Sequence, residues 1–276
     1  MEDKVMSDIF RATWVVAYRE LLRFIQERSR IFSSFAMPLM FLVIFGAGFN
    51  RIIGAMTPGV DFIQFMFPGI IAMTVLMNSV MSGLSVVWDR EFGFLKEILV
   101  APLGRSGIVM GKVVGAAAVA VMQGIVMLVL APVLGVSLSP MLVLKLIPML
   151  ILLSMSLSGL GVLIASRMRS QQGFQIVVQI LVFPMMFLSG IFFPVNNVPT
   201  WMEVISKINP LTYGVDVIRQ LFLGSEIAAN SGAAGSYIIG VRVFGHTMTM
   251  LEEVLVVAVF GIALLSAAAW SFSRQE

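Results

Sequence analysis

Long stretches without a charged residue dominate the chain. A helix of about 20 apolar residues spans the hydrocarbon core of a bilayer, which is about 30 Å thick. Six stretches are free of Asp, Glu, Lys and Arg, at residues 31–50, 62–88, 113–144, 146–166, 170–202 and 254–273. The third and fifth are too long for one upright helix, so each is expected to include interfacial or re-entrant residues. The pattern predicts an all-α integral membrane protein with six transmembrane helices.

The composition supports this interpretation. Hydrophobic residues make up 59% of the 276 residues and charged residues only 12%, whereas a soluble domain has about 25% charged residues. This balance excludes an ordinary cytosolic enzyme, a disordered chain and a module that binds nucleic acid. The chain has no Cys and one His, His246. A disulfide framework, a thiolate site and a His-cluster metal site are therefore excluded, and no metal site is expected.

Basic residues are distributed unequally between the loops on the two sides. Thirteen of the 18 Lys and Arg residues precede the first span, follow the second or fourth, or lie in the tail, and five lie in the other loops. Cytoplasmic loops carry an excess of Lys and Arg. Both termini are therefore expected in the cytoplasm, in a multi-pass protein of the cytoplasmic (inner) membrane. No cleavable signal peptide is visible, so the first span is expected to act as its own signal.

Residues 1–30 precede the first span and carry an amphipathic helical pattern. Its apolar residues recur at helical spacing and are Phe10, Trp14, Tyr18, Leu21, Leu22 and Ile25. A helix of this kind lies in the membrane interface, with Trp and Tyr at the level of the lipid headgroups. The alternative is a soluble helix that packs on a cytoplasmic domain. Because no such domain is visible, the pattern favours a cytoplasmic interfacial helix.

The loop at residues 89–105 is the main cytoplasmic loop and is not polar throughout. A helical stretch within it has Phe92, Leu95 and Leu99 on one face and ends at Pro102. Apolar residues exposed to the cytoplasm indicate docking on another protein. On the opposite side, the long external segment at 195–253 mixes prolines with anchoring aromatic residues. That pattern predicts re-entrant external helices between the fifth and sixth spans.

The chain offers few candidates for chemistry of its own. The predicted spans contain no charged residue, which weighs against a proton- or ion-coupled transporter. A membrane protease would need Ser with His, paired Asp residues or a HExxH motif, and the sequence has no such set. Around Lys112, Ser106 replaces the first Gly of a phosphate-binding loop and Val113 replaces its Mg²⁺-binding hydroxyl. We therefore expect no cofactor in this chain, and ATP and Mg²⁺ on a partner subunit.

Uncharged polar residues inside the predicted spans have two interpretations. For any single residue, an interhelical hydrogen bond of ~0.6 kcal/mol is favoured over a place in the lining of a pathway. Small residues at four-residue steps predict close approach of helices. The polar residues are Asn78, Ser79, Ser82, Gln123, Ser154, Ser156, Ser158, Gln175 and Gln179, and the small ones are Gly111, Gly115, Ala116, Ala120 and Gly124.

Two motifs resemble those of a known family, the type-2 ATP-binding-cassette (ABC) exporter permeases. The family's cytoplasmic loop is similar to Asp89, Arg90, Glu91, Phe92 and Gly93, with Leu95, Glu97, Leu99, Pro102, Arg105, Gly111 and Lys112. Its fifth-span signature is similar to residues 187–191, with Pro194, Pro199, Trp201, residues 209–211, Tyr213, Asp216 and Arg219. The span count, internal termini and interfacial helix also fit. The resemblance therefore covers residues 1–276 as a single transmembrane domain and is closest to the drug-efflux branch.

The resemblance implies a permease dimer, of two copies or of one copy with a paralogue, bound to two cytoplasmic ABC ATPase subunits. In the family, the loop after the second span forms a coupling helix seated in a groove of the ATPase. The residues that would contact the ATPase are Glu91, Gly93, Phe94, Leu95 and Glu97 in the loop, with Arg23 and Arg28 of the N-terminal helix. Family members often have Thr and Glu where this chain has Phe94 and Lys96, so the charge pairing with a given ATPase cannot be carried over.

These observations predict the membrane subunit of an ATP-driven exporter of amphiphilic or drug-like compounds, which is not itself an enzyme. Cargo would pass along the dimer interface between the second and fifth spans, beside Asn78, Ser82, Gln179 and Phe183. A lining rich in Met and Phe favours hydrophobic cargo over polysaccharide or a lipid-linked glycan, which is the alternative cargo. A third interpretation is a membrane scaffold that recruits an ATPase and transports nothing.

Overall fold

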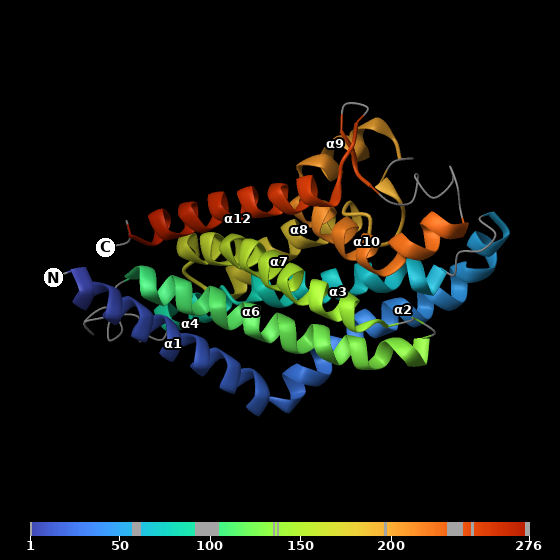
Figure 1. Ribbon diagram of the computed structural model, residues 1–276. Helices are drawn as coiled ribbons and strands as arrows, with labels where there is room; N and C mark the ends of the chain where they lie inside the picture. Colours follow the sequence, from blue (N-terminus) through green and yellow to red (C-terminus); the bar gives the residue numbers. More distant parts are fainter. Residues whose placement is uncertain are drawn as a thin grey trace.

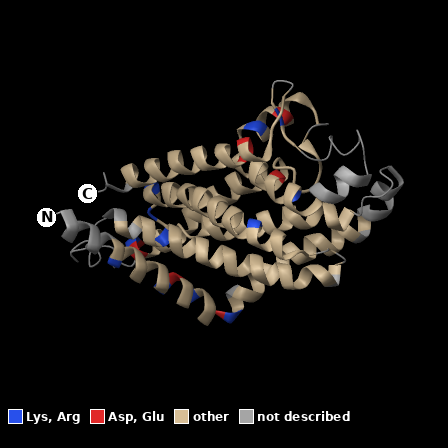
Figure 2. Cartoon of the chain, viewed as in Figure 1, with Lys and Arg blue, Asp and Glu red and all other residues tan. Residues whose placement is uncertain are grey.

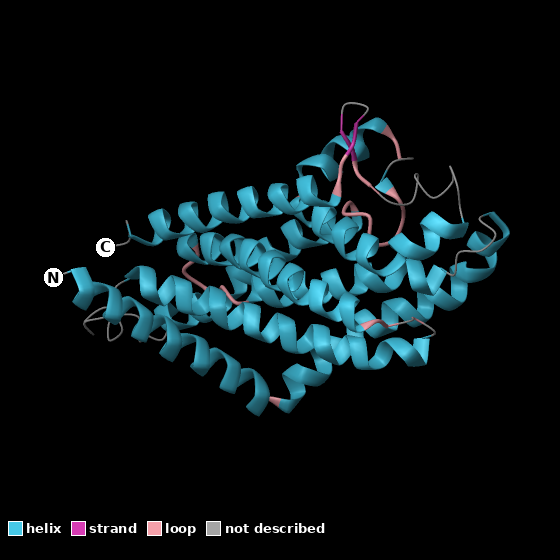
Figure 3. Ribbon diagram, viewed as in Figure 1, coloured by secondary structure: helices cyan, strands magenta, loops and turns pink. Residues whose placement is uncertain are grey.

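The computed structural model describes residues 2–56, 62–91, 105–134, 136, 138–195, 198–230, 240–243 and 246–273. Most of these residues are helical (Figure 3). The helices are α1 (Glu2–Gln26), α2 (Arg28–Met56), α3 (Phe62–Met81), α4 (Leu84–Glu91), α6 (Arg105–Leu130), α7 (Pro140–Arg167), α8 (Gln171–Phe187), α9 (Thr200–Ile208), α10 (Pro210–Asn230) and α12 (Met250–Ser273). A 3₁₀ turn, η1 (Ala131–Leu134), follows α6, and β1 (Arg242–Val243) pairs antiparallel with β2 (His246–Thr247).

The helices form one elongated bundle with two distinct ends (Figure 1). The start of α1 and the end of α12 lie at one end, which we call the terminal end, close to α4 and the start of α6. The β1–β2 hairpin and α9 lie toward the other end, which we call the hairpin end. Figure 2 shows most charged residues toward the two ends and along α1, with one basic position in the middle of the bundle. This is the distribution expected of a protein whose middle lies in a hydrocarbon core.

Helix α3 forms the centre of the bundle. All residues from 65 to 76 are buried. A helix that is apolar on every side is stable only where neighbours cover it all round. Among the described residues, α2, α6, α7, α8 and α10 pack against α3. The break between α3 and α4 lies at residues 82–83, where an added Cβ on Gly83 would collide with the backbone carbonyl of Gly161 in α7. Only a glycine fits there.

One pair of the polar residues, and several of the small residues, join helices as the sequence predicted. The hydroxyl groups of Ser79 in α3 and Ser154 in α7 form a hydrogen bond of 2.7 Å, which confirms the interhelical interpretation for that pair. The predicted close approach at Gly111 and Gly115 of α6 is also confirmed, and the neighbour is α1. A Cβ on Gly111 would lie 2.6 Å from the Cβ of Val16, and one on Gly115 would lie 2.9 Å from the Cβ of Glu20.

The N-terminal segment is a helix, α1, with two different faces. Small apolar residues, including Ala12 and Ala17, are buried against α6. Three aromatic residues face outward, since Phe10 is 74%, Trp14 is 65% and Tyr18 is 54% exposed, whereas Phe24 is buried. The amphipathic pattern is therefore found in the structure, and the outward aromatic face is available to lipid. Location of α1 in the membrane interface stays a prediction.

Several helices are long and apolar enough to span a membrane. Four segments meet this description within the described residues, namely Phe62–Glu91, Val109–Leu130, Pro140–Arg167 and Met250–Ser271. The segments Phe10–Gln26 and Ile31–Gly46 are long and apolar enough only when they are taken together, and they are bent by 71° relative to each other. Helix α8 is apolar but has only 17 residues. A mostly helical chain with four or five helices of this kind is confirmed. A total of six spans stays a prediction.

The boundary predicted between the third and fourth spans is wrong. Helix α6 ends at Leu130, and α7 begins at Pro140, whereas the sequence analysis divided the spans at Lys145. Ser139 caps α7 by accepting a hydrogen bond of 3.1 Å from the backbone N–H of Leu142, and proline is favoured at the first position of a helix. Lys145 lies within α7 and is exposed. Counting charges alone therefore missed a start signal that uncharged residues provide.

The segment predicted to be external, residues 195–253, contains α9, α10 and the hairpin. Helix α10 packs against α3, α7 and α12, while α9 exposes apolar side chains that include Trp201 and Ile208. The predicted helices in this segment are therefore present. Their re-entrant placement in the membrane stays a prediction.

Candidate functional site

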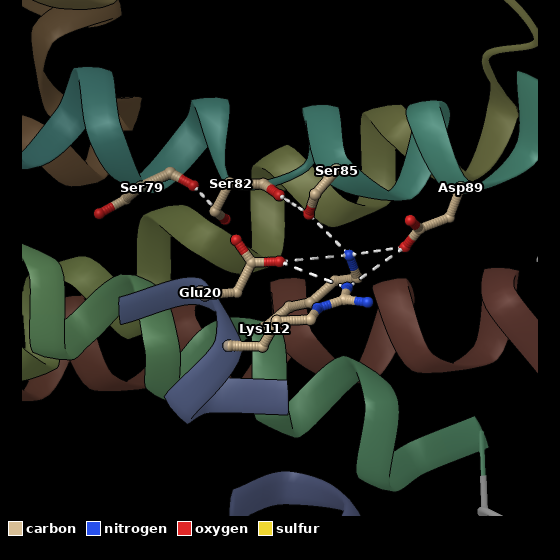
Figure 4. A network of polar contacts seen from close by, with 7 residues as sticks. Glu20, Ser79, Ser82, Ser85, Asp89 and Lys112 are labelled. Atoms are coloured by element: carbon tan, nitrogen blue, oxygen red, sulfur yellow. Dashed lines mark hydrogen bonds and ion pairs between the residues drawn. The ribbon is translucent and has the colours of Figure 1, made fainter. Parts of the chain in front are cut away.

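A cluster of charged and polar side chains lies at the terminal end, where α1, α4 and α6 meet (Figure 4). Its centre is Lys112 of α6, whose side chain is 2% exposed. The ammonium of Lys112 donates to the Ser85 hydroxyl at 2.6 Å and to Asp89 Oδ2 at 3.2 Å, both on α4. It also lies 3.7 Å from Glu20 Oε1 on α1. Three helices therefore converge on one buried cation.

Arg19 completes the cluster and balances its charge. Its guanidinium lies 3.7 Å from Asp89 Oδ2 and 3.8 Å from Glu20 Oε1. The cluster thus holds two cations and two carboxylates. A buried charge is stable only when it is paired and hydrogen-bonded, because desolvation costs several kcal/mol per ion. The balance explains how Lys112 remains buried beside apolar helices.

The cluster brackets the loop that the sequence analysis singled out. Asp89 lies two residues before the end of α4, and Lys112 lies in the first turns of α6. Their ion pair therefore joins the two flanks of residues 92–104, which lie outside the described part of the chain. Helix α1 is bound to the same point through Glu20.

A second set of contacts ties the end of α4 to the turn between α7 and α8. The Arg90 guanidinium donates to the backbone carbonyl of Met168 at 2.7 Å and to that of Ser166 at 3.3 Å. Glu91 Oε2 accepts from the backbone N–H of Gln171 at 3.1 Å. The Ser166 hydroxyl also shares a 2.7 Å hydrogen bond with that of Ser271 in α12. The terminal end is thus one connected network.

At the hairpin end, the residues of the second motif hold a turn in place. Arg219 of α10 is 3% exposed, donates to the backbone carbonyl of Gly190 at 2.6 Å, and lies 4.0 Å from the centre of the Phe65 ring. Gly190 has a φ of 84°, a conformation that favours glycine. Asn209 donates to the backbone carbonyl of Met185 at 2.7 Å.

Two buried carboxyl groups anchor the hairpin to the bundle. Asp216 Oδ2 of α10 accepts from the backbone N–H of Gly240 at 2.9 Å, and Glu253 Oε1 of α12 accepts from that of Val241 at 3.2 Å. The side-chain amide of Gln220 donates to both carboxyl groups at 2.9 Å. The second motif therefore has a structural role, in which it fixes the hairpin end on α10 and α12.

Comparison with known proteins gives a consistent picture. The model of the ABC-2 type transporter family matches residues 11–223. The putative transport permease ycf38 of Cyanophora paradoxa is 31% identical over 209 residues, which cover 74% of this chain and 72% of that protein. The probable multidrug ABC transporter permease YbhR of Escherichia coli (strain K12) is 34% identical over 167 residues, 60% of this chain and 45% of YbhR. Nodulation protein J of Rhizobium meliloti (strain 1021) is 29% identical over 199 residues, 71% of this chain and 75% of that protein.

The chain belongs to the ABC-2 type transporter family. The resemblance seen in the sequence is therefore confirmed. ABC-2 permeases are the membrane subunits of transporters, are not themselves catalytic, and associate with ATP-binding-cassette subunits.

Only part of the predicted ATPase-contacting surface of this permease falls within the described residues. Glu91 is exposed at the end of α4 and contacts α8. Arg28 is exposed at the start of α2, and Arg23 is half-buried on α1. The loop residues Gly93, Phe94, Leu95 and Glu97 lie outside the described residues. Contact of these seven residues with an ATPase stays a prediction.

Three of the four predicted pathway residues of this permease lie on α3 and α8, and Ser82 lies at the break after α3. On α3, the Asn78 amide donates to the backbone carbonyl of Thr74 at 3.0 Å. Ser82, at the break after α3, donates to the backbone carbonyl of Ser79 at 2.7 Å. On α8, Gln179 is exposed and Phe183 is 49% exposed. The pair on α8 therefore faces away from the core of the chain, and a shared cargo pathway stays a prediction.

Sequence reasoning missed the ion-pair cluster of this permease. It placed Asp89 and Lys112 in the family's cytoplasmic-loop motif and tested Lys112 as part of a phosphate-binding loop, but it did not pair the two side chains. A usable signal was present, because opposite charges directly flank two apolar spans on either side of one short loop. The contribution of Glu20 from α1 had no such signal, since it depends on the packing of α1 against Gly111 and Gly115.

Proposed function

We propose that this chain is the permease subunit of an ATP-driven exporter that moves amphiphilic or drug-like compounds across the cytoplasmic membrane. Two ABC ATPase subunits bind its terminal end in the cytoplasm, where both termini also lie, and they supply ATP and Mg²⁺. A second permease, as a copy or a paralogue, completes the pathway. Family membership and the similarity to YbhR, which is described as a probable multidrug permease, support this proposal.

The observation that carries the proposal is the ion-pair cluster around Lys112. A coupling element must pass a displacement from a loop to the helices on both sides of it. Lys112 joins α6 to α4 through Asp89 and to α1 through Glu20. Arg90 joins α4 to the turn between α7 and α8. Closure of the ATPases would therefore move these helices as one body, and rigid-body motion of two halves gives alternating access.

The test is charge reversal at Glu91, in the permease copurified with its ATPase subunits and reconstituted in liposomes. ATP hydrolysis and ATP-driven movement of an uncharged lipophilic dye, Nile red, are measured together. Glu91→Arg should insert in the membrane normally but hydrolyse ATP without moving the dye, because it loses the contact with α8 and reverses the charge next to the coupling loop. Glu203→Arg is a matched control, since Glu203 pairs with Lys207 at the hairpin end. Normal transport by Glu91→Arg would refute the assignment of the coupling site.

The same preparation separates the other interpretations. ATP hydrolysis stimulated by a lipid-linked glycan and not by the dye would favour the alternative cargo. ATPase subunits that bind the permease but respond to no cargo would indicate a scaffold.

A further inference from the structure

A cavity lies at the terminal end between α1 and the break that separates α3 from α4. We infer that this cavity binds the uncharged, hydroxyl-bearing head of an amphiphile. The inference rests on the proposed function, because it identifies the class of compound that this permease would admit.

Polar and apolar side chains line the cavity, from α1 on one side and from the end of α3, the break and α4 on the other. Its volume is about 220 Å³, and it adjoins a wider groove of about 490 Å³. A water molecule in the liquid occupies about 30 Å³, so the cavity has room for more than a bridging water. Its lining consists of Glu20, Arg23, Glu27, Met81, Ser82, Leu84, Ser85 and Trp88, and the groove adds Arg19, Leu22 and Gln26.

Two lining residues present buried polar atoms without a hydrogen bond. Glu20 Oε1 is an acceptor and Trp88 Nε1 is a donor, and neither has a hydrogen-bond partner among the described residues. The cations nearest to Glu20 Oε1 lie at 3.7 and 3.8 Å, which suits ion pairs but is too long for hydrogen bonds. A buried polar atom left unpaired is costly and calls for a partner. A hydroxyl group both donates and accepts, so it can satisfy both atoms.

The charge of the lining indicates an uncharged head. Arg19 and Arg23 supply two cations, and Glu20 and Glu27 supply two carboxylates. The buried cation nearby, Lys112, is already balanced by Asp89. A cationic or anionic head would therefore add an uncompensated charge to a partly buried site, which is unfavourable.

Apolar residues beside the cavity can hold the rest of an amphiphile. Met81 and Leu84 line the cavity, and Leu22 lines the groove. On α1, Ile25 is 47% exposed and lies three residues after Leu22, so the two side chains are neighbours on one helix face. A polar head in the cavity would thus leave its alkyl chain along an apolar surface that reaches the outside of the bundle.

Binding is tested on the full-length permease alone in lipid nanodiscs, without ATPase or nucleotide. The probe is tritiated 1-dodecylglycerol, measured by scintillation proximity. We expect saturable binding above that of empty nanodiscs, and no competition from equal concentrations of dodecyltrimethylammonium or dodecyl sulfate.

Glu20→Ala should weaken binding at least five-fold. Ser82→Leu, which fills the cavity and leaves all ion pairs intact, should weaken it at least ten-fold. Glu203→Ala at the hairpin end should bind as the wild type does.

Binding that is not saturable, stronger competition by either ionic compound, or Ser82→Leu binding like the wild type would each overturn the inference. In the last case the cavity holds only water. Because no ATPase takes part, a failure here is distinct from a failure of the proposed function, which the transport assay reports separately.

Discussion

The side chain of Lys112 shows how a single buried charge can organise one end of a membrane protein. Its ammonium contacts residues of α1 and α4 while its own backbone belongs to α6. In an apolar environment such a cation is stable only with its partners in place. The contacts of Lys112 therefore fix the positions of α1, α4 and α6 relative to one another.

Replacement of Lys112 tests this dependence. Lys112→Met leaves Asp89 and Glu20 buried close together with only Arg19 to balance them, and removal of one partner of a buried pair costs about 3–5 kcal/mol. We expect the midpoint of thermal unfolding in detergent to fall markedly. The double variant Lys112→Met with Asp89→Asn should recover part of the loss, because it removes the stranded charge. If Lys112→Met unfolds at the wild-type temperature, the cluster does not stabilise the bundle.

Arg219 has a comparable role at the hairpin end. Its planar guanidinium reaches the Gly190 carbonyl and stacks on Phe65 at the same time, a geometry that the lysine ammonium cannot reproduce. Arg219→Lys should therefore lower the free energy of unfolding by about 2 kcal/mol, measured by denaturant unfolding in detergent. Arg242→Lys, at an exposed residue of β1, is the control. Equal stability of both variants would contradict the role given to Arg219.

At the scale of residues, the sequence identified which side chains matter better than it identified what they do. Arg219 and Asp216 were found through a family motif, but the sequence does not show that Arg219 meets Phe65 of another helix. Lys112 was found through the other family motif, but its ion pairs were not, because its partners are distant in the sequence. Such pairings depend on how the helices pack, and helix packing cannot be inferred from the residues next to each member of the pair.

At the scale of elements, small residues decide which helices lie in contact. Gly111 and Gly115 allow α1 to approach α6 closely, and this brings Glu20 within reach of Lys112. The position of α1 is therefore set by residues of another helix, ninety and more positions away.

A bulky residue at Gly115 should displace α1. A Cβ there already lies 2.9 Å from Glu20 and 3.2 Å from the Cα of Ala17, so Gly115→Leu cannot be accommodated without movement. The measurement is thiol cross-linking between Thr13→Cys and Gly107→Cys, two positions joined by a 3.4 Å contact. We expect the yield to fall several-fold. Gly48→Leu, where an added Cβ meets nothing within 4 Å, should leave the yield unchanged. An unchanged cross-linking yield with Gly115→Leu would show that the position of α1 does not depend on its contact with α6 at Gly115.

The sequence predicted helices well and their boundaries less well. Long uncharged stretches identified α3 and α12 because hydrocarbon excludes charge over the whole length of a span. The same criterion misplaced the division between α6 and α7, since Ser139 and Pro140 start α7 without a charge. The bend of 71° between α1 and α2 lies at the boundary that the sequence placed between an N-terminal helix at residues 1–30 and a first span at 31–50.

At the scale of the whole molecule, the two ends of the bundle differ in construction. At the terminal end, an ion pair between Lys112 and Asp89 holds the two flanks of the coupling loop together. At the hairpin end, the motif residues Arg219 and Asp216 hold a turn and the hairpin on α10. Between them, exposed apolar side chains of α12, including Leu255, Val259 and Ile262, cover the outside. An apolar exterior between two polar ends is suited to a molecule surrounded by lipid.

The proposed orientation of the two ends can be tested directly, because the chain contains no Cys and a single introduced thiol is therefore unambiguous. Glu91 at the terminal end and His246 at the hairpin end are both exposed. In sealed right-side-out membrane vesicles, a membrane-impermeant maleimide should label His246→Cys and should label Glu91→Cys only after the vesicles are opened. The excess of basic residues in the loops of the terminal end is the physical reason.

Two further positions serve as internal controls for this measurement. Arg169→Cys, exposed in the turn between α7 and α8, should follow Glu91→Cys, and Thr200→Cys, exposed at the start of α9, should follow His246→Cys. The Cys-free wild type gives the background. Labelling of Glu91→Cys and Arg169→Cys in sealed vesicles would place the terminal end outside. A cytoplasmic ATPase could then not reach the cluster around Lys112, and the proposed coupling of ATP hydrolysis to transport would fail with it.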